Sequence, residues 1–150
     1  MPLPFSLAYT LSCAAEVHLF RREGQVARER AEVMITLSTE QGFAFFLARG
    51  TMVRGWALAE QGQVKEGIAQ MEQGLAAFRA IGVEMSQPPY LALLAEAQGK
   101  VGQVEEGLAT LKVLCSSLFI LVAVAKIISH LFHGFSPRVH GSMNFGGQLL

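Results

Sequence analysis

A nearly repeated hexapeptide is the feature that most constrains the fold. Residues 62–67 read GQVKEG, residues 102–107 read GQVEEG, and residues 24–26 already read GQV. The three anchors thus begin at positions 24, 62 and 102, at nearly equal steps. Internal periods of this size are typical of stacked supersecondary units, because one such unit cannot bury its apolar face alone. A chain of 150 residues therefore has room for about three units.

Each anchor glycine separates two helical patterns. Helix-like runs precede the anchors over residues 4–22, 43–60 and 88–100. After the anchors, apolar residues recur at steps of three and four, as one stripe of an amphipathic helix does: Val64, Ile68, Met71, Leu75 and Phe78, then Val104, Leu108, Leu111 and Leu114. Glycine tolerates the left-handed backbone that ends many helices. The pattern predicts an all-α fold of antiparallel helix-hairpin repeats, bent at Gly24, Gly62 and Gly102.

Two further glycines occupy equivalent positions inside second helices. Gly67 and Gly107 each lie five residues after an anchor glycine. Glycine in a helix interior costs about 1 kcal/mol relative to alanine. We therefore expect the paired helix to approach closely at both positions.

The repeat resembles the tetratricopeptide (TPR) family. That family places a small residue in the first helix, a glycine at the turn, and a small residue with an apolar neighbour in the second helix. The matching residues are Gly55, Gly62, Gly67 and Ile68 in the second unit and Ala95, Gly102, Gly107 and Leu108 in the third. The spacing exceeds the usual TPR period of about 34 residues. The resemblance therefore implies a TPR-like α-solenoid of about three units with longer helices.

A narrower likeness covers about residues 3–113. The stretches RGWALAEQGQVKEGIAQMEQGLAAFRAIG and YLALLAEAQGKVGQVEEGLATL resemble the C-terminal helical repeats of large bacterial predicted ATPases. Many of those proteins also carry an adenylate or guanylate cyclase domain, and their nucleotide chemistry resides in other domains. The likeness implies a cytoplasmic, non-catalytic scaffold for a protein or peptide, as a fragment or relative of the regulatory repeats of a signalling protein.

The same resemblance implies a binding groove. In TPR arrays the first helices of successive units line a concave surface. Carried across, this rule selects His18, Arg21, Arg22, Arg49, Met52, Trp56, Glu60, Glu96 and Lys100. The arginines would attract an acidic group or a C-terminal carboxylate, and Met52 and Trp56 would supply apolar contact. An alternative for Trp56 is packing between helices.

The chain changes character near residue 113. All twelve acidic residues precede that point, and only Lys126 and Arg138 are charged after it. We divide the chain into a repeat array over 1–112, an apolar helix over 113–133 and an unstructured tail over 134–150. Three interpretations of the apolar segment stay open: a membrane anchor over 113–132, a buried helix that caps the array or pairs with a second copy, and the product of a truncated or frameshifted gene without independent function.

Little in the sequence indicates chemistry. Zero net charge gives no electrostatic case for nucleic acid. There is no Asp, and Cys13 and Cys115 form no zinc or disulfide pattern, which favours two buried thiols in a reducing compartment. His130 and His133 share a spacing with metal ligands but lack further partners at ligand spacing. No phosphate-binding or nucleophile motif is present. We therefore expect no enzyme activity, metal or cofactor.

Overall fold

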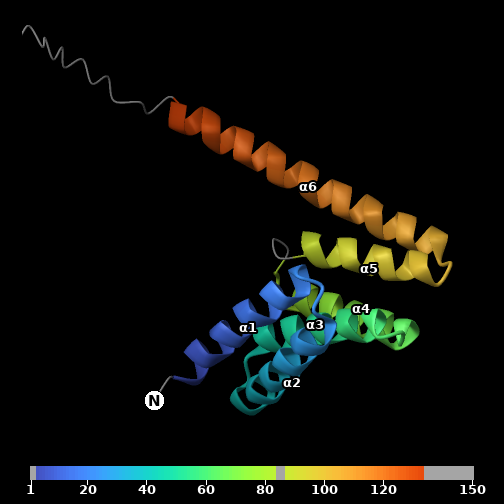
Figure 1. Ribbon diagram of the computed structural model, residues 1–150. Helices are drawn as coiled ribbons and strands as arrows, with labels where there is room; N and C mark the ends of the chain where they lie inside the picture. The colour runs from blue at the N-terminus through green and yellow to red at the C-terminus, as the bar shows by residue number, and fades with distance from the viewer. Residues whose placement is uncertain (1–2, 84–86, 134–150) are drawn as a thin grey trace, which may run out of the picture. The chain divides into compact units, whose positions relative to one another are not determined.

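The described part of the protein is entirely α-helical. The computed structural model describes residues 3–83 and 87–133, with side chains as far as Ile128. These ranges hold six helices and no strand: α1 (Pro4–Phe20), α2 (Gly24–Gln41), α3 (Ala44–Glu60), α4 (Val64–Ala80), α5 (Pro88–Lys100) and α6 (Val104–His133) (Figure 1). The predicted all-α class is confirmed. Helices α1, α3 and α5 begin and end within two residues of the ranges that the apolar pattern predicts.

A left-handed residue lies in each turn from one helix to the next. Positive φ angles occur at Arg22 (60°), Gly42 (70°), Gly62 (91°), Gly82 (73°) and Gly102 (78°). These five positions are evenly spaced along the chain, so the step from Arg22 to Gly62 equals the step from Gly62 to Gly102. We call this step, which holds one pair of helices, the structural period. The predicted bends at Gly62 and Gly102 are confirmed, because each glycine lies in the left-handed turn between two helices.

The predicted bend at Gly24 is wrong. Gly24 is the first residue of α2, and Arg22 adopts the left-handed conformation in its place. Two backbone hydrogen bonds fix this turn: the Arg22 N–H donates to the Leu19 carbonyl and the Glu23 N–H donates to the His18 carbonyl. The first GQV therefore lies two residues out of register with the others. The structural period is constant, and the shorter step between the first two GQV segments is a coincidence of sequence.

Helices α3 and α4 cross in very close contact at paired glycines. A Cβ atom added to Gly67 would lie 2.4 Å from the Gly55 carbonyl oxygen, and one added to Gly55 would lie 2.7 Å from the Gly67 carbonyl oxygen. At Gly74 an added Cβ would meet the Ala48 carbonyl at 2.9 Å. The close approach that Gly67 predicts is therefore confirmed. At Gly107 the nearest atom is 3.5 Å away, an ordinary contact, so the same expectation is wrong there.

The core runs along the helices of the first two pairs and into α5. Buried side chains come from each of these helices, and the largest include Leu19, Met34, Met71, Phe78 and Leu91. Aromatic rings connect the second pair of helices internally and to the third: Phe45 of α3 lies against Phe78 of α4, and Phe78 stacks on Tyr90 of α5. The apolar stripe predicted on α4 is buried from Ile68 to Phe78. This burial is what holds one pair of helices against the next.

Helix α6 departs from the predicted pattern. It continues without a break through the predicted boundary at residues 112 and 113, and the compact helical unit extends to Leu118. Its stripe residues Val104, Leu108 and Leu111 stay exposed, because α6 is the last helix in the described ranges and no described helix follows to cover them. The predicted tail over 134–150 lies outside the described residues.

Both cysteines are exposed, so the prediction of buried thiols is wrong. Cys13 lies on the outer face of α1 and Cys115 on α6. No described helix covers either face, so both thiols are exposed to solvent. Within the described ranges, no group of three metal-binding side chains gathers.

Candidate partner-binding surface

Four of the predicted groove residues meet in one charged cluster at the ends of three first helices. Arg22 follows α1, Glu60 ends α3, and Glu96 and Lys100 lie in the last turns of α5. The Arg22 guanidinium donates two hydrogen bonds to the Glu96 carboxylate, at 2.9 and 3.1 Å. The Lys100 ammonium donates to Glu60 at 2.7 Å and lies 3.2 Å from Glu96. We call these four residues the charged cluster.

The charged cluster contains two acidic and two basic side chains, and the pairing shifts the pKa of three of them. The hydrogen bond from Arg22 lowers the pKa of the Glu96 carboxyl, and burial opposes this only in part. The hydrogen bond to Glu60 raises the pKa of Lys100, and the bond to Glu96 raises that of Arg22. These shifts favour the charged forms of Arg22, Glu96 and Lys100.

Water still reaches the cations of this surface. The side chains of Arg22 and Lys100 are 51% and 44% exposed. Arg21, next along the chain, is 66% exposed and pairs with Glu23, which also lies 2.5 Å from the His18 ring. A ligand could therefore reach three cations that lie at the ends of first helices.

Arg49 does not belong to this open surface, contrary to the prediction. Its guanidinium pairs with the Glu16 carboxylate of α1, and its Nε donates to Glu16 at 2.9 Å and to the Tyr90 hydroxyl oxygen at 3.1 Å. The Tyr90 hydroxyl in turn donates to Glu16 at 2.7 Å. These three mostly buried side chains, which we call the buried triad, join α1, α3 and α5.

The electrostatics of the buried triad follow from its burial. Burial raises the pKa of the Tyr90 hydroxyl, so it keeps its proton and donates to Glu16. Burial also lowers the pKa of Arg49, but its hydrogen bonds to Glu16 and Tyr90 outweigh that effect and the net shift is upward. The positive charge of Arg49 is thus already neutralised inside the fold, and a partner's carboxylate would have to displace Glu16.

Met52 and Trp56 are also misplaced by the prediction. Both are buried in the core, where the Met52 side chain lies over Gly74 of α4. The indole N–H of Trp56 has no hydrogen-bond partner among the described residues. The alternative considered for Trp56, packing between helices, is what the structure shows. Neither side chain is available to a partner in a surface groove.

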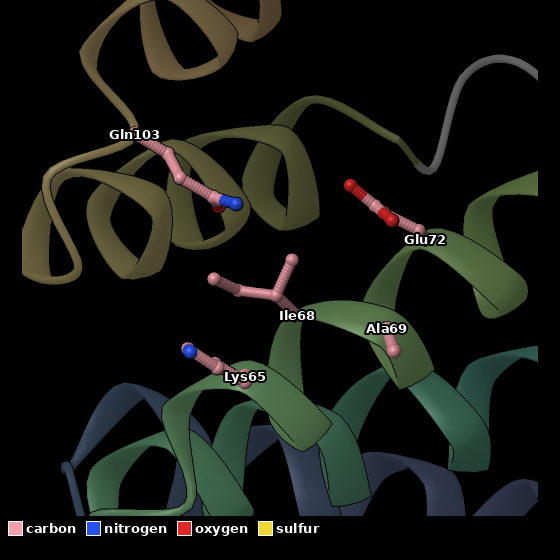
Figure 2. Close-up of a pocket in the computed structure, with 5 residues that line it drawn as sticks. All are labelled: Lys65, Ile68, Ala69, Glu72 and Gln103. Carbon is pink, nitrogen blue, oxygen red and sulfur yellow. The ribbon is translucent and has the colours of Figure 1, made fainter.

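Two surface hollows lie where no groove was predicted. The first, of about 410 Å³, is lined by Lys65, Ile68, Ala69 and Glu72 of α4 and by Gln103. Figure 2 shows these α4 side chains with Gln103 across the hollow from them. The second, of about 380 Å³, lies among α4, α5 and the start of α6. The repeated GQVKEG and GQVEEG segments supply Lys65 and Gln103, but no chemical motif marked either hollow.

The acid stability of the fold should report on the charged cluster. Because the pKa of Glu96 is lowered, its contribution is fully present above the ordinary value of 4.5 and is lost as pH falls through the lower folded value. We expect Glu96→Gln to reduce the free energy of unfolding at pH 7 by about 0.5–1 kcal/mol, since the pair is solvent-screened. The measurement is urea unfolding at pH 7 and pH 3.

The variant should lose less stability between the two pH values than the native chain does. Glu29→Gln is the matched control, because exposed Glu29 accepts a hydrogen bond only from the neutral Gln25 among the described side chains. Equal acid losses in the native chain and in both variants would contradict the assignment of this effect to Glu96.

Comparison with known proteins gives no relative. No family model, curated protein or solved structure matches this chain. The likeness to TPR repeats therefore rests on the residues quoted above.

Proposed function

We propose that this chain is a non-catalytic, TPR-like scaffold that binds an acidic peptide or a C-terminal carboxylate at the ends of its first helices. The observation that supports this most is the convergence of Arg22, Glu60, Glu96 and Lys100 from three successive first helices. A surface assembled in this way exists only when the helix pairs stack. A ligand bound there would contact side chains from all three pairs of helices at once.

The charged cluster holds its cations ready for an anion. Ion pairs with Glu96 and Glu60 restrain the long side chains of Arg22 and Lys100. This restraint reduces the conformational entropy that the two side chains lose when a ligand binds. An incoming carboxylate adds hydrogen bonds to the exposed guanidinium and ammonium N–H groups and to Arg21. Affinity for such a ligand is expected to fall with salt, because all three cations face water.

Peptide binding tests this proposal directly. The probe is a fluorescent octapeptide of alternating Glu and Ala with a free C-terminal carboxylate, titrated with the full chain while anisotropy is recorded. We expect Arg21→Ala to weaken binding about 2–5-fold, which corresponds to the loss of one exposed ion pair. Arg21 is chosen because its ion pair in the described residues is with neighbouring Glu23, so its removal leaves the charged cluster intact.

Arg79→Ala is the matched control, since Arg79 is an exposed arginine in the last turn of α4. Its removal changes the net charge equally and should leave the affinity unchanged. An amidated peptide should bind more weakly than the free acid. Identical losses in the Arg21 and Arg79 variants would show non-specific charge attraction and overturn the proposed site.

Membrane tethering is a second candidate function, favoured by one observation on α6. The stretch Val104–Ile128 is long and apolar enough to cross a bilayer, and the most apolar part of it is not buried in the fold. Phe119, Ile120 and Ile127 are among its most exposed side chains. A helix of this kind would place the repeat array at a membrane surface, with Lys126 extending its ammonium group toward the headgroups.

Carbonate extraction of the expressed full chain tests the tether. We expect the native chain in the membrane pellet and the Val122→Lys/Val124→Lys variant in the supernatant, because each central lysine costs about 2.5–3.5 kcal/mol on insertion scales. Val33→Lys, at an exposed position of α2, should leave the native chain's distribution unchanged. Recovery of the native chain in the carbonate supernatant would exclude insertion.

A further inference from the structure

The first helix has an open face that the repeat elsewhere covers. In α3, Val53 and Ala57 are completely buried. The residues one structural period earlier, Cys13 and Val17, are exposed on α1, Val17 by 54%. The constant period makes these positions equivalent. The face of α1 that corresponds to the buried face of α3 therefore lacks a neighbour in the described ranges.

Helix α2 is what covers the equivalent face of α3. The two helices run antiparallel: the start of α2 at Gly24 lies beside Ala57 and Glu60, and Ile35 lies against Gly50. At one end of this junction the Gln61 amide donates to the Gln25 side-chain oxygen at 2.9 Å. These contacts define three points of the junction between one helix pair and the next.

Helix α6 carries the other half of the same junction. It begins at Val104, two structural periods after Gly24 begins α2, so the two helices hold equivalent places in their pairs. Val104 is 61% exposed, and Leu111 and Cys115, the counterparts of Ala31 and Ile35, are exposed as well. These residues belong to the compact unit, which extends to Leu118. The unit thus has two uncovered packing faces: one on α6, equivalent to the face of α2 that contacts α3, and one on α1, equivalent to the face of α3 that contacts α2.

We infer that the partner of each face is a second copy of this chain, with α6 of one copy packed on α1 of the next as α2 packs on α3. Shifting the α2–α3 contacts by the structural period gives the residue pairs expected between copies. Val104 meets Phe20, which is 66% exposed, in place of Gly24 and Glu60. Glu105 meets Arg21 in place of Gln25 and Gln61. A neutral hydrogen bond inside the chain thus becomes an ion pair of opposite charges between copies.

The third pair of positions is complementary in volume. Inside the chain, Ile35 lies so close to Gly50 that an added Cβ would be 2.7 Å from its Cγ1 atom. Between copies the glycine becomes Thr10, which is larger, and the isoleucine becomes Cys115, which is smaller. The smaller side chain on α6 makes room for the larger one on α1. An added Cβ at Gly50 also lies 3.3 Å from the Ala31 carbonyl oxygen, so the two helices must lie a few tenths of an ångström farther apart between copies than within one.

A contact of this kind joins two different surfaces, so it does not close on itself in a dimer. An oligomer of any length keeps one uncovered α1 face at one end and one uncovered α6 face at the other. The chain should therefore form head-to-tail oligomers that grow with concentration. This inference rests on the repeat register and shares Arg21 with the proposed peptide site. Thr10, Glu105 and Cys115 lie outside that site, so variants at these positions test the contact between copies separately.

Disulfide trapping tests the geometry. The full chain with Cys13→Ser and Thr10→Cys is oxidised mildly in a non-ionic detergent and run on a non-reducing gel. We expect a ladder of cross-linked species, at least about tenfold more than from Thr36→Cys in the same background, and a mass-mapped link between position 10 and native Cys115. Thr36 is an exposed residue of α2 outside the proposed contact. Links only between two Cys115 side chains, or no excess over the Thr36 control, would overturn the inference.

Charge exchange supplies a second readout that needs no cysteine. Arg21→Glu and Glu105→Arg, each alone, place like charges across the contact and should weaken self-association at least about threefold in sedimentation velocity. In an equimolar mixture both contacts between unlike variants pair opposite charges, so the mixture should recover head-to-tail oligomers in which the two variants alternate. Failure of the mixture to associate more than either variant alone contradicts the head-to-tail contact, whatever the peptide assay shows.

Discussion

Replacing Glu16 by leucine is expected to lower the free energy of unfolding by about 2–4 kcal/mol. The substitution leaves the mostly buried guanidinium of Arg49 with only the neutral Tyr90 hydroxyl as a polar partner in the buried triad. Removing one member of a buried ion pair is strongly destabilising because the remaining charge keeps its desolvation cost. Urea unfolding followed by circular dichroism measures the change.

A triple variant separates this effect from a simple loss of packing. Glu16→Leu, Arg49→Met and Tyr90→Phe together remove every polar group of the buried triad and leave no charge or hydroxyl unpaired. We expect the triple variant to recover most of the stability, since an apolar replacement of similar volume is often neutral or better. If the triple variant is as unstable as the sum of its single changes, the triad contributes net stability as a unit and our account of the single variant is wrong.

Alanine at Gly67 is expected to destabilise the fold by about 2 kcal/mol, within the range that overpacking of a core typically costs. The new Cβ would lie 2.4 Å from the Gly55 carbonyl oxygen and 2.8 Å from the Ala59 backbone nitrogen. Both neighbours are backbone atoms, so α3 and α4 must separate to admit the methyl group. The loss exceeds the gain of about 1 kcal/mol that alanine brings to a helix interior.

Gly107→Ala is the matched control, because Gly107 holds the same place in its own helix. Its added Cβ would meet the Ala95 carbonyl at 3.5 Å, an ordinary contact distance. We expect the substitution to stabilise the chain by about 0.5–1 kcal/mol through helix propensity. Equal effects at both glycines, measured by urea unfolding, would contradict the difference in helix approach that the structure shows.

The sequence predicts the helices well because their signals are local. Apolar steps of three and four, a glycine at four of the five turns and the two prolines that begin α5 act within a few residues. The exact positions of the turns are harder to predict. The first GQV suggested a bend at Gly24, whereas the turn falls at Arg22, two residues earlier. Arginine gives no sign of a left-handed turn, so only the backbone could reveal the constant period.

The candidate surface was predicted in part. Arg22, Glu60, Glu96 and Lys100 meet as the choice of first-helix ends implied, but they pair with one another. Met52, Trp56 and Arg49 were assigned to the same groove and lie inside the fold instead. A helical pattern gives the face on which a residue lies. It does not tell which of two apolar faces a neighbouring pair of helices covers.

By itself, the sequence determined that the chain is all-α, where α1, α3 and α5 lie, and that α6 is too apolar to match the helices before it. These properties depend on residues close together along the chain. Tertiary structure alone decided the rest. It joined Glu16 to Tyr90, which are far apart in sequence, required glycine at 67 but not at 107, and left one face of α1 and one face of α6 uncovered. Each of these depends on distances between helices, which no local pattern of residues encodes.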